Sequence, residues 1–212
     1  MIILEDKAQQ EGKHVTKNNY WKSQDIDVIR QPLPVGDYIL VNDKVQELID
    51  RKAARGIEIK KMDFLGTYKV CVDTKNSIEE LLSDISGKQH ARFRDECILA
   101  QNNNIQLYIL VENLGGEIKN TGIYNSTITT LDELHQWKNP RLFIMTNSDE
   151  VIGTYKNGRP RFKKVQKYPK ATRGAWLMKA CKTMESKYGV KFLFTTPENA
   201  GAEVIRLLSE GE

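Results

Sequence analysis

Residues 107–111 read Leu-Tyr-Ile-Leu-Val, a continuous apolar run with the length of one β-strand. A strand that is apolar on both faces is typical of a sheet covered by helices on both sides. Helical patterns surround this run: residues 77–87 and 89–103 precede it, and residues 172–188 follow it. Because strand and helix patterns alternate, the sequence predicts the α/β class, with a mixed central β-sheet flanked by helices.

The other expected elements are distributed along the whole chain. Strands are expected over 2–4, 25–30, 38–41, 68–73, 142–145 and 190–194, and helices over 13–23, 45–61, 130–137 and 197–208. Strands 25–30 and 38–41 are expected to form a hairpin around a Pro- and Gly-containing turn. A single domain over residues 1–212 fits this length, with a charged insertion at about 42–66 and an irregular basic stretch over 147–170.

Positive charge is concentrated near the C-terminus. Residues 159–191 contain eleven Lys or Arg residues and one acid, so this basic segment carries +10 and the remainder carries −6. Such asymmetry predicts a polyanionic partner, and the alternative is a solvated surface without one. Interleaved aromatic residues favour a nucleic-acid partner. The candidate DNA-binding side chains in this segment are Arg161, Lys163, Lys164, Lys167, Lys170 and Arg173.

Hydropathy and cysteine content indicate a non-membrane protein of a reducing compartment. No apolar run approaches the roughly 20 residues of a membrane span, and the N-terminus turns acidic too early for a signal peptide. Cys71, Cys97 and Cys181 have unrelated spacings that fit neither a disulfide framework nor a zinc ribbon, so we expect inert core residues. The expected location is a reducing cytoplasm, and the family resemblance described below implies that of a bacterial or phage-infected cell.

Two acids and a lysine form the strongest candidate for chemistry. Asp37 lies in the turn VGDY at the start of a strand, and Asp73 ends the strand YKVCVD and is followed by Thr74 and Lys75. Residues two apart on a strand share a face, so Asp73 and Lys75 can point into one site. Clustered carboxylates favour a hard divalent cation, and a lysine can stabilise charge on a phosphate. Spacing alone also fits an ordinary surface salt bridge.

Longer motifs connect these residues to a known family. The stretches LPVGDYIL (33–40), VCVDTKNSIEELLSDISGKQHARFRDECILAQ (70–101), LYILVEN (107–113) and the tail 182–208 resemble the XPF-type structure-specific nuclease domain, a branch of the PD-(D/E)xK superfamily. That family shows a Gly-Asp turn, a strand ending in Glu-Arg-Lys, an acid four residues later, and a buried strand ending in an acid. The Asp-Thr-Lys triplet is similar to small phage or mobile-element members.

The resemblance implies a restriction-endonuclease-like nuclease core and a set of site residues. Asp37, Asp73 and Lys75 would be catalytic, and Mg²⁺ or Mn²⁺ would bind Asp37 and Asp73 with Glu5 or Glu79. Glu5 would replace an Asp of the family motif, and Ala8 stands where that motif has a second acid. Larger members carry helix-hairpin-helix repeats after the nuclease, and we expect the basic segment to supply their DNA affinity here.

Other residues have competing interpretations. Lys88, His90, Arg92 and Arg94 are expected to contact DNA, with a solvated helix end as the alternative. An i,i+4 ion pair with Arg92 is the simpler role for Glu96. The side chains of Trp137 and Trp176 are both expected to pack in the core.

The sequence thus predicts a metal-dependent DNA endonuclease that hydrolyses phosphodiester bonds, with branched or flapped DNA suggested by the family. A DNA-binding module of the same fold with lost or weak catalysis, acting in recombination or counter-defence, is the alternative, and an RNA-directed nuclease is a third hypothesis. A homodimer and a monomer both remain open. If the basic segment neutralises about six phosphates, DNA affinity should fall about 10³-fold between 50 and 200 mM salt.

Overall fold

The computed structural model describes residues 1–10, 12 and 14–210, and its centre is a six-stranded mixed sheet. The strand order is β10-β5-β4-β3-β1-β2. The bounds are β1 Ile2–Asp6, β2 Asp27–Gln31, β3 Tyr38–Leu40, β4 Val70–Lys75, β5 Gln106–Glu112 and β10 Lys191–Thr195. β3 runs antiparallel to both of its neighbours, whereas the pairs β1–β2, β4–β5 and β5–β10 are parallel. The predicted α/β class with a mixed sheet is confirmed.

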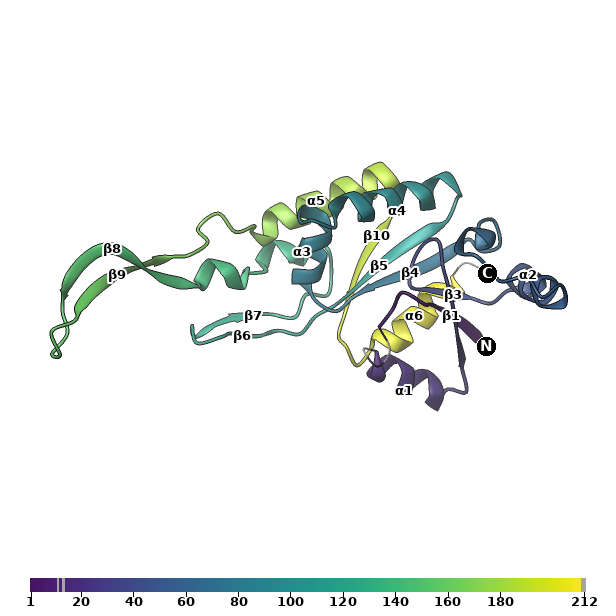
Figure 1. Ribbon diagram of the computed structural model, residues 1–212, viewed down its shortest axis with the longest axis horizontal. Coiled ribbons are helices and arrows are strands. Elements are labelled where there is room, and N and C mark those ends of the chain that lie inside the picture. Colours follow the sequence, from purple (N-terminus) through teal and green to yellow (C-terminus); the bar gives the residue numbers. More distant parts are fainter. Residues whose placement is uncertain (11, 13, 211–212) are drawn as a thin grey trace.

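Helices cover both faces of the sheet (Figure 1). One face carries α3 Ile78–Ser86, α4 His90–Asn102 and α5 Gly174–Tyr188, and the other carries α1 Val15–Ser23 and α6 Ala200–Ser209. Ser77 begins α3 as predicted, because its side chain accepts a hydrogen bond of 3.1 Å from the Glu80 backbone N–H. The charged stretch after β3 contains α2 Asp43–Ala54 and the 3₁₀ turn η1 Lys61–Phe64.

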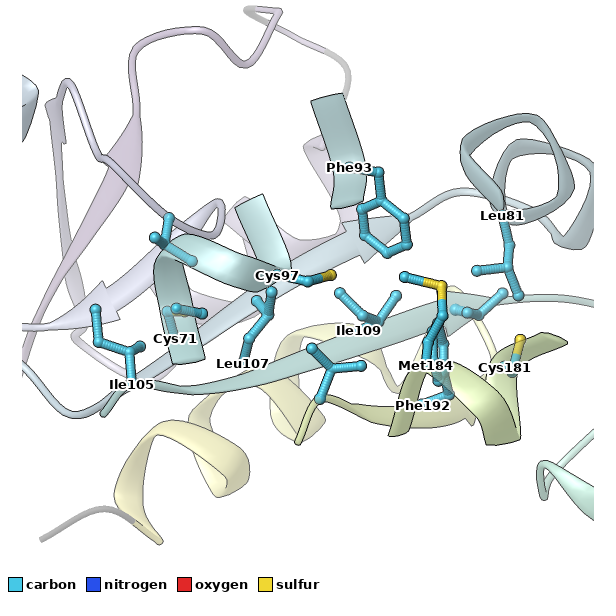
Figure 2. Close-up of a cluster of buried hydrophobic side chains, with 14 of the residues drawn as sticks. Cys71, Leu81, Phe93, Cys97, Ile105, Leu107, Ile109, Cys181, Met184 and Phe192 are labelled. Atoms are coloured by element: carbon cyan, nitrogen blue, oxygen red, sulfur yellow. The ribbon is translucent and has the colours of Figure 1, made fainter. Parts of the chain in front are cut away.

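The larger core lies between the sheet and helices α3–α5. Figure 2 shows Leu107 and Ile109 of β5 packed beneath Phe93 and Cys97 of α4, with Met184 of α5 beside them. All three cysteines are free and buried, and burial raises the pKa of Cys97 to about 12. The prediction of inert core cysteines is therefore confirmed.

The expected hairpin of β2 with β3 is wrong. β1 lies between these two strands and pairs with both, because its buried residues Ile3 and Leu4 need neighbours on each side. The proline-containing segment between β2 and β3 therefore crosses over β1 instead of making a tight turn.

The expected strand over 142–145 is also wrong. A 3₁₀ turn, η3 Pro140–Phe143, occupies its first half, and only Met145 lies in a strand. Ile144 and Met145 are 44% and 51% exposed. The apolar run is not covered by other elements, so its hydrophobicity does not indicate a core strand here. The short helix expected near 130–137 is present as the 3₁₀ helix η2 Asp132–Gln136.

The stretch expected to be irregular forms two strands, β8 Met145–Thr154 and β9 Pro160–Gln166. They pair with each other in antiparallel fashion and extend away from the body as an arm (Figure 1). A smaller hairpin, β6 Gly116–Ile118 with β7 Ile123–Asn125, lies outside the main sheet as well. Both hairpins are largely polar and exposed, so they lack the burial pattern from which strands are predicted.

Candidate functional site

The Gly-Asp turn delivers Asp37 to the centre of the sheet. Gly36 has φ of +73°, and a Cβ on it would lie 2.8 Å from the Cβ of Cys71, so only glycine fits. The carboxylate of Asp37 accepts hydrogen bonds from the backbone N–H and the hydroxyl of Thr74, at 2.8 and 3.0 Å. These bonds tie the start of β3 to the end of β4 and fix the orientation of the Asp37 side chain.

Asp73 and Lys75 point to the same face of β4, as the strand period predicts. The Lys75 ammonium lies 2.9 and 2.7 Å from the two carboxylate oxygens of Asp73. It also lies 2.9 Å from the Asp84 carboxylate of α3, and it sits over the Phe93 ring at 5.3 Å from the ring centre. Lys75 is thus held by two acids and one aromatic ring at a buried position.

Glu96 of α4 brings another carboxylate to this point. Its Oε1 accepts a hydrogen bond of 2.9 Å from the backbone N–H of Gly36, directly before Asp37. The interpretation of Glu96 as a surface i,i+4 partner of Arg92 is therefore wrong. The contact joins residues 60 apart in sequence, so helical spacing could not reveal it.

The carboxylates around Lys75 outnumber its single ammonium group, and their pKa values reflect this. Burial raises the pKa of Asp73 well above its ordinary value, Lys75 opposes the shift, and the charges of Asp37 and Glu96 add to it. Burial likewise raises the pKa of Glu96, although its hydrogen bond from Gly36 and the charge of Lys75 lower it. For Lys75, burial lowers the pKa, but the surrounding acids outweigh it and the net shift is upward. The acids exceed the single ammonium group, so this point has a high affinity for further positive charge.

These side chains line an open cavity of about 670 Å³. The acids on its wall are Asp6, Asp37, Asp73, Glu80, Asp84, Asp95 and Glu96. Cationic side chains lie on the same wall, from three different segments: Lys7, Lys61 and Arg92. Acids at the base with cations nearby suit a phosphate-containing ligand, because the cations can neutralise oxygens that the acids repel.

Glu5 and Glu79, the two expected additional ligands, are not among the residues that line this cavity. Side chains alternate along β1, so Glu5 points to the opposite face and Asp6 takes the place on the cavity. On α3, Glu79 faces a different hollow, whereas Glu80 faces the cavity. In each case the neighbouring acid lines the cavity, because a step of one residue changes the face on a strand and rotates the side chain by about 100° on a helix.

Glu5 instead belongs to a second buried polar cluster on the α1 side of the sheet. Its carboxylate accepts a hydrogen bond of 3.4 Å from the Tyr38 hydroxyl and lies 3.4 Å from Nε of Arg30. Nearby, Lys17 of α1 forms a buried ion pair with Glu112 at the end of β5. We call these five residues the rear cluster.

Most of the expected DNA-binding side chains are exposed and away from the cavity. Of the four near the start of α4, only Arg92 lines it, whereas Arg94 pairs with Asp95 at 2.9 Å. Lys88 and His90 are exposed on the solvent side. Among the residues expected in the basic segment, Arg161, Lys163 and Lys164 lie on strand β9 of the arm, and Lys163 pairs with Glu150 at 2.8 Å. The remaining three, Lys167, Lys170 and Arg173, lie between the arm and α5.

The donor chemistry around Asp37 and Asp73 fits a hard divalent cation, since the available ligands are carboxylate oxygens. Within residues 1–10, 12 and 14–210, however, no group of three or more His, Cys, Asp or Glu side chains is placed so that it could hold a metal ion. Mg²⁺ is commonly bound through one or two carboxylates and keeps several waters, so two acids in an open cavity meet its needs. Asp37 and Asp73 are the residues that would hold it.

The comparisons with known proteins agree with this arrangement. A model of the ERCC4 domain matches residues 6–208. The chain belongs to the ERCC4 domain family. Members of this family are generally nucleases, so the acid-lined cavity lies in a nuclease-type domain.

Two solved structures are similar to the ERCC4 domain described above. They are "XPF from Aeropyrum pernix" and the same protein in complex with DNA, each 14% identical with a TM-score of 0.48. The match covers 99% of this chain and 64% of the solved chain, so this chain spans about two thirds of that protein's length. No curated protein sequence matches the chain. None of the helices that the structure describes has the length and apolar character needed to cross a bilayer.

Proposed function

We propose that this ERCC4 domain is a metal-dependent endonuclease that hydrolyses phosphodiester bonds of DNA. The observation that carries the proposal is the cavity that Asp37, Asp73, Asp84 and Glu96 line together, in which Asp73 and Asp84 hold the Lys75 ammonium and further cations lie on the wall. Branched or flapped DNA is the proposed substrate, and a bacterial or phage-infected cytoplasm is the proposed location.

Asp37 and Asp73 would bind Mg²⁺ or Mn²⁺, which when present supplies a polarising charge for the phosphate and an acidified water. Lys75 stabilises negative charge that develops on the phosphate oxygens, because its ammonium is held in place by Asp73 and Asp84. Thr74 keeps the Asp37 carboxylate oriented through its two hydrogen bonds.

The cations on the cavity wall would bind flanking phosphates and position the strand. Lys7, Lys61 and Arg92 surround the acids from three separate segments, so they can contact successive phosphates rather than one. Arg161, Lys163, Lys164 and Lys167 on or beside the arm would add salt-sensitive affinity farther from the cut. No side chain is proposed to select a base.

The second candidate is a DNA-binding module that has lost or weakened catalysis. Two observations favour it: the described residues form no closed three-ligand cage, and Ala8 lines the cavity where the family motif has an acid. This protein would bind the same DNA without cutting it.

A cleavage screen separates the two functions. Labelled flap, fork, four-way junction, duplex, single-stranded DNA and matching RNA are incubated with the protein in Mg²⁺, Mn²⁺ or EDTA, and binding is measured in parallel. We expect cleavage of branched DNA that depends on the metal and is lost in Asp73→Asn. Binding without cleavage of any substrate would establish the second candidate, and preferential cleavage of RNA would replace DNA as the substrate.

A further inference from the structure

The first turn of α5 exposes a tryptophan. Trp176 is 50% exposed, whereas Trp21 and Trp137 are 0% and 5% exposed. The expectation that both Trp137 and Trp176 pack in the core is confirmed for Trp137 and wrong for Trp176. A large exposed aromatic side chain can contact a ligand. The positions of Trp21 and Trp137, in contrast, are explained by packing in the core.

Cationic side chains surround Trp176. A shallow depression of about 470 Å³ is lined by Trp176 and by Lys170, Thr172, Arg173, Ala175 and Lys179. Its lining thus contains three cations and no acid. Within the described part of the chain none of these three cations forms an ion pair, whereas Lys182 on the same helix pairs with Asp132 at 2.5 Å. The depression therefore carries uncompensated positive charge.

The backbone holds this turn firmly in place. Gly174, the first residue of α5, packs so closely against η2 that a Cβ on it would lie 2.3 Å from the Leu134 carbonyl oxygen and 2.6 Å from that of Trp137. Arg173 is the N-cap of α5 and, with Lys170, precedes the helix, whereas Trp176 and Lys179 lie on it. The close packing of Gly174 therefore fixes the helix turn that carries Trp176.

We infer that this depression binds an unpaired nucleotide of a single DNA strand. The base stacks on the Trp176 ring, and Lys170, Arg173 and Lys179 contact the phosphates on either side. Positive charge without acids favours a nucleic acid over a protein partner. Only an unstacked base can offer its face to an exposed ring, so the ligand is single-stranded. The inference rests on the proposed function for its choice of DNA, and it adds a preference for substrates with a single-stranded part.

Intrinsic fluorescence can test this directly. Since the other two tryptophans are buried, a fluorescence change on adding DNA reports Trp176. The full chain is titrated in EDTA, so that no cleavage occurs, with an oligothymidylate of about 10 nucleotides and with a duplex of equal length. We expect strong quenching by the single strand and weaker quenching by the duplex. Equal or absent quenching would overturn the inference.

Variants supply the second measurement. We expect Trp176→Ala to weaken single-strand binding by about tenfold, in the range known for loss of one base-stacking contact, and to leave duplex binding within about twofold. Trp176→Phe should retain most of the affinity, because a stacking ring remains. Tyr124→Ala is the matched control, since Tyr124 is 61% exposed but lies outside the depression. Thermal unfolding confirms that each variant is folded.

The outcomes are distinct from those of the cleavage screen. If Trp176→Ala binds both DNA forms as the parent does, or loses both equally, the depression is not a single-strand site, and a protein partner becomes its alternative. If the parent shows the quenching but cuts nothing, the proposed hydrolysis fails and this inference stands. If it cuts branched DNA without the quenching, the inference fails and the hydrolysis stands.

Discussion

The two faces of the sheet carry two buried clusters of acids and cations, and they differ in balance and in access. On the α3–α5 side, four acids surround one ammonium group and line an open cavity: Asp37, Asp73, Asp84 and Glu96 around Lys75. On the other side, the rear cluster holds Glu5 and Glu112 against Arg30 and Lys17, with the Tyr38 hydroxyl between. The rear charges are matched in number, whereas those of the cavity are not.

This difference shows that an acid beside a lysine does not by itself indicate catalysis. In the rear cluster the pairs satisfy one another, so the cluster contributes to the fold. At the cavity the excess negative charge favours a further cation, and the opening would admit one together with the phosphate of the proposed substrate. Balance and access therefore separate a site from a structural ion pair.

The largest expected effect contrasts one acid from each face. Asp73→Asn should reduce DNA cleavage by at least about 10³-fold, because a carboxylate proposed to hold the metal is lost, while Glu5→Gln should stay within about threefold of the parent. Initial rates on the best substrate of the cleavage screen measure both. Comparable losses of cleavage rate in the two variants would show that the acids of the cavity and of the rear cluster do not differ in function.

The next effect concerns stability. Lys17→Met leaves the Glu112 carboxylate buried without its cation, so the free energy of unfolding should fall by about 3–5 kcal/mol in urea titrations. Replacing both partners, as in Lys17→Met with Glu112→Leu, should restore most of the loss. If the free energy of unfolding of the double variant stays as low as that of the single variant, the Lys17–Glu112 pair has a role beyond mutual charge compensation.

A divalent cation should stabilise the protein by binding at the cavity and not at the rear cluster. At about 100 times its dissociation constant, Mg²⁺ adds about 2.7 kcal/mol, which is roughly 5–10 °C in the unfolding midpoint of a chain of this size. We expect this shift in the parent and in Glu5→Gln, and its absence in Asp37→Asn. Differential scanning fluorimetry with and without EDTA provides the measurement. A shift that persists in Asp37→Asn places the ion elsewhere.

The smallest expected effect depends on pH. The pKa of Glu96 is raised from 4.5 by burial, so its favourable contribution to stability is complete below pH 4.5 and is lost as the pH rises through the folded-state pKa. In EDTA, Glu96→Gln should therefore be more stable than the parent at neutral pH, and the gain should vanish near pH 4, as urea titrations at both pH values would measure. A gain that is constant between pH 4 and pH 8 would exclude ionisation of Glu96 as its cause.

Sequence could predict the parts of this site that depend on local geometry. Asp73 and Lys75 share a face because they are two apart on one strand, and Gly36 marks a turn that only glycine can make. The fold class followed from the buried run at 107–111 and the helices around it. The roles of these residues in hydrolysis remain predictions that the proposed experiments test.

Tertiary contacts decided what sequence could not. Glu96 reaches Gly36 only because α4 packs over the sheet, and Lys75 meets Asp84 only because α3 folds back beside β4. Glu5 and Asp6 are neighbours on β1, and only the structure shows which of the two faces the cavity. The arm was expected to be irregular and Trp176 to be buried, because sequence alone does not show which segments stay exposed.

The antiparallel pairing of β3 with β4 has a consequence for biosynthesis. Asp37 begins one strand and Asp73 nearly ends the other, and Tyr38 pairs with Val72 across 34 residues of chain that include α2. A nascent polypeptide cannot assemble the acids until this stretch has left the ribosome and its strands have paired. A nascent chain that ends before β4 therefore lacks this pair of acids, whatever local structure it has already formed.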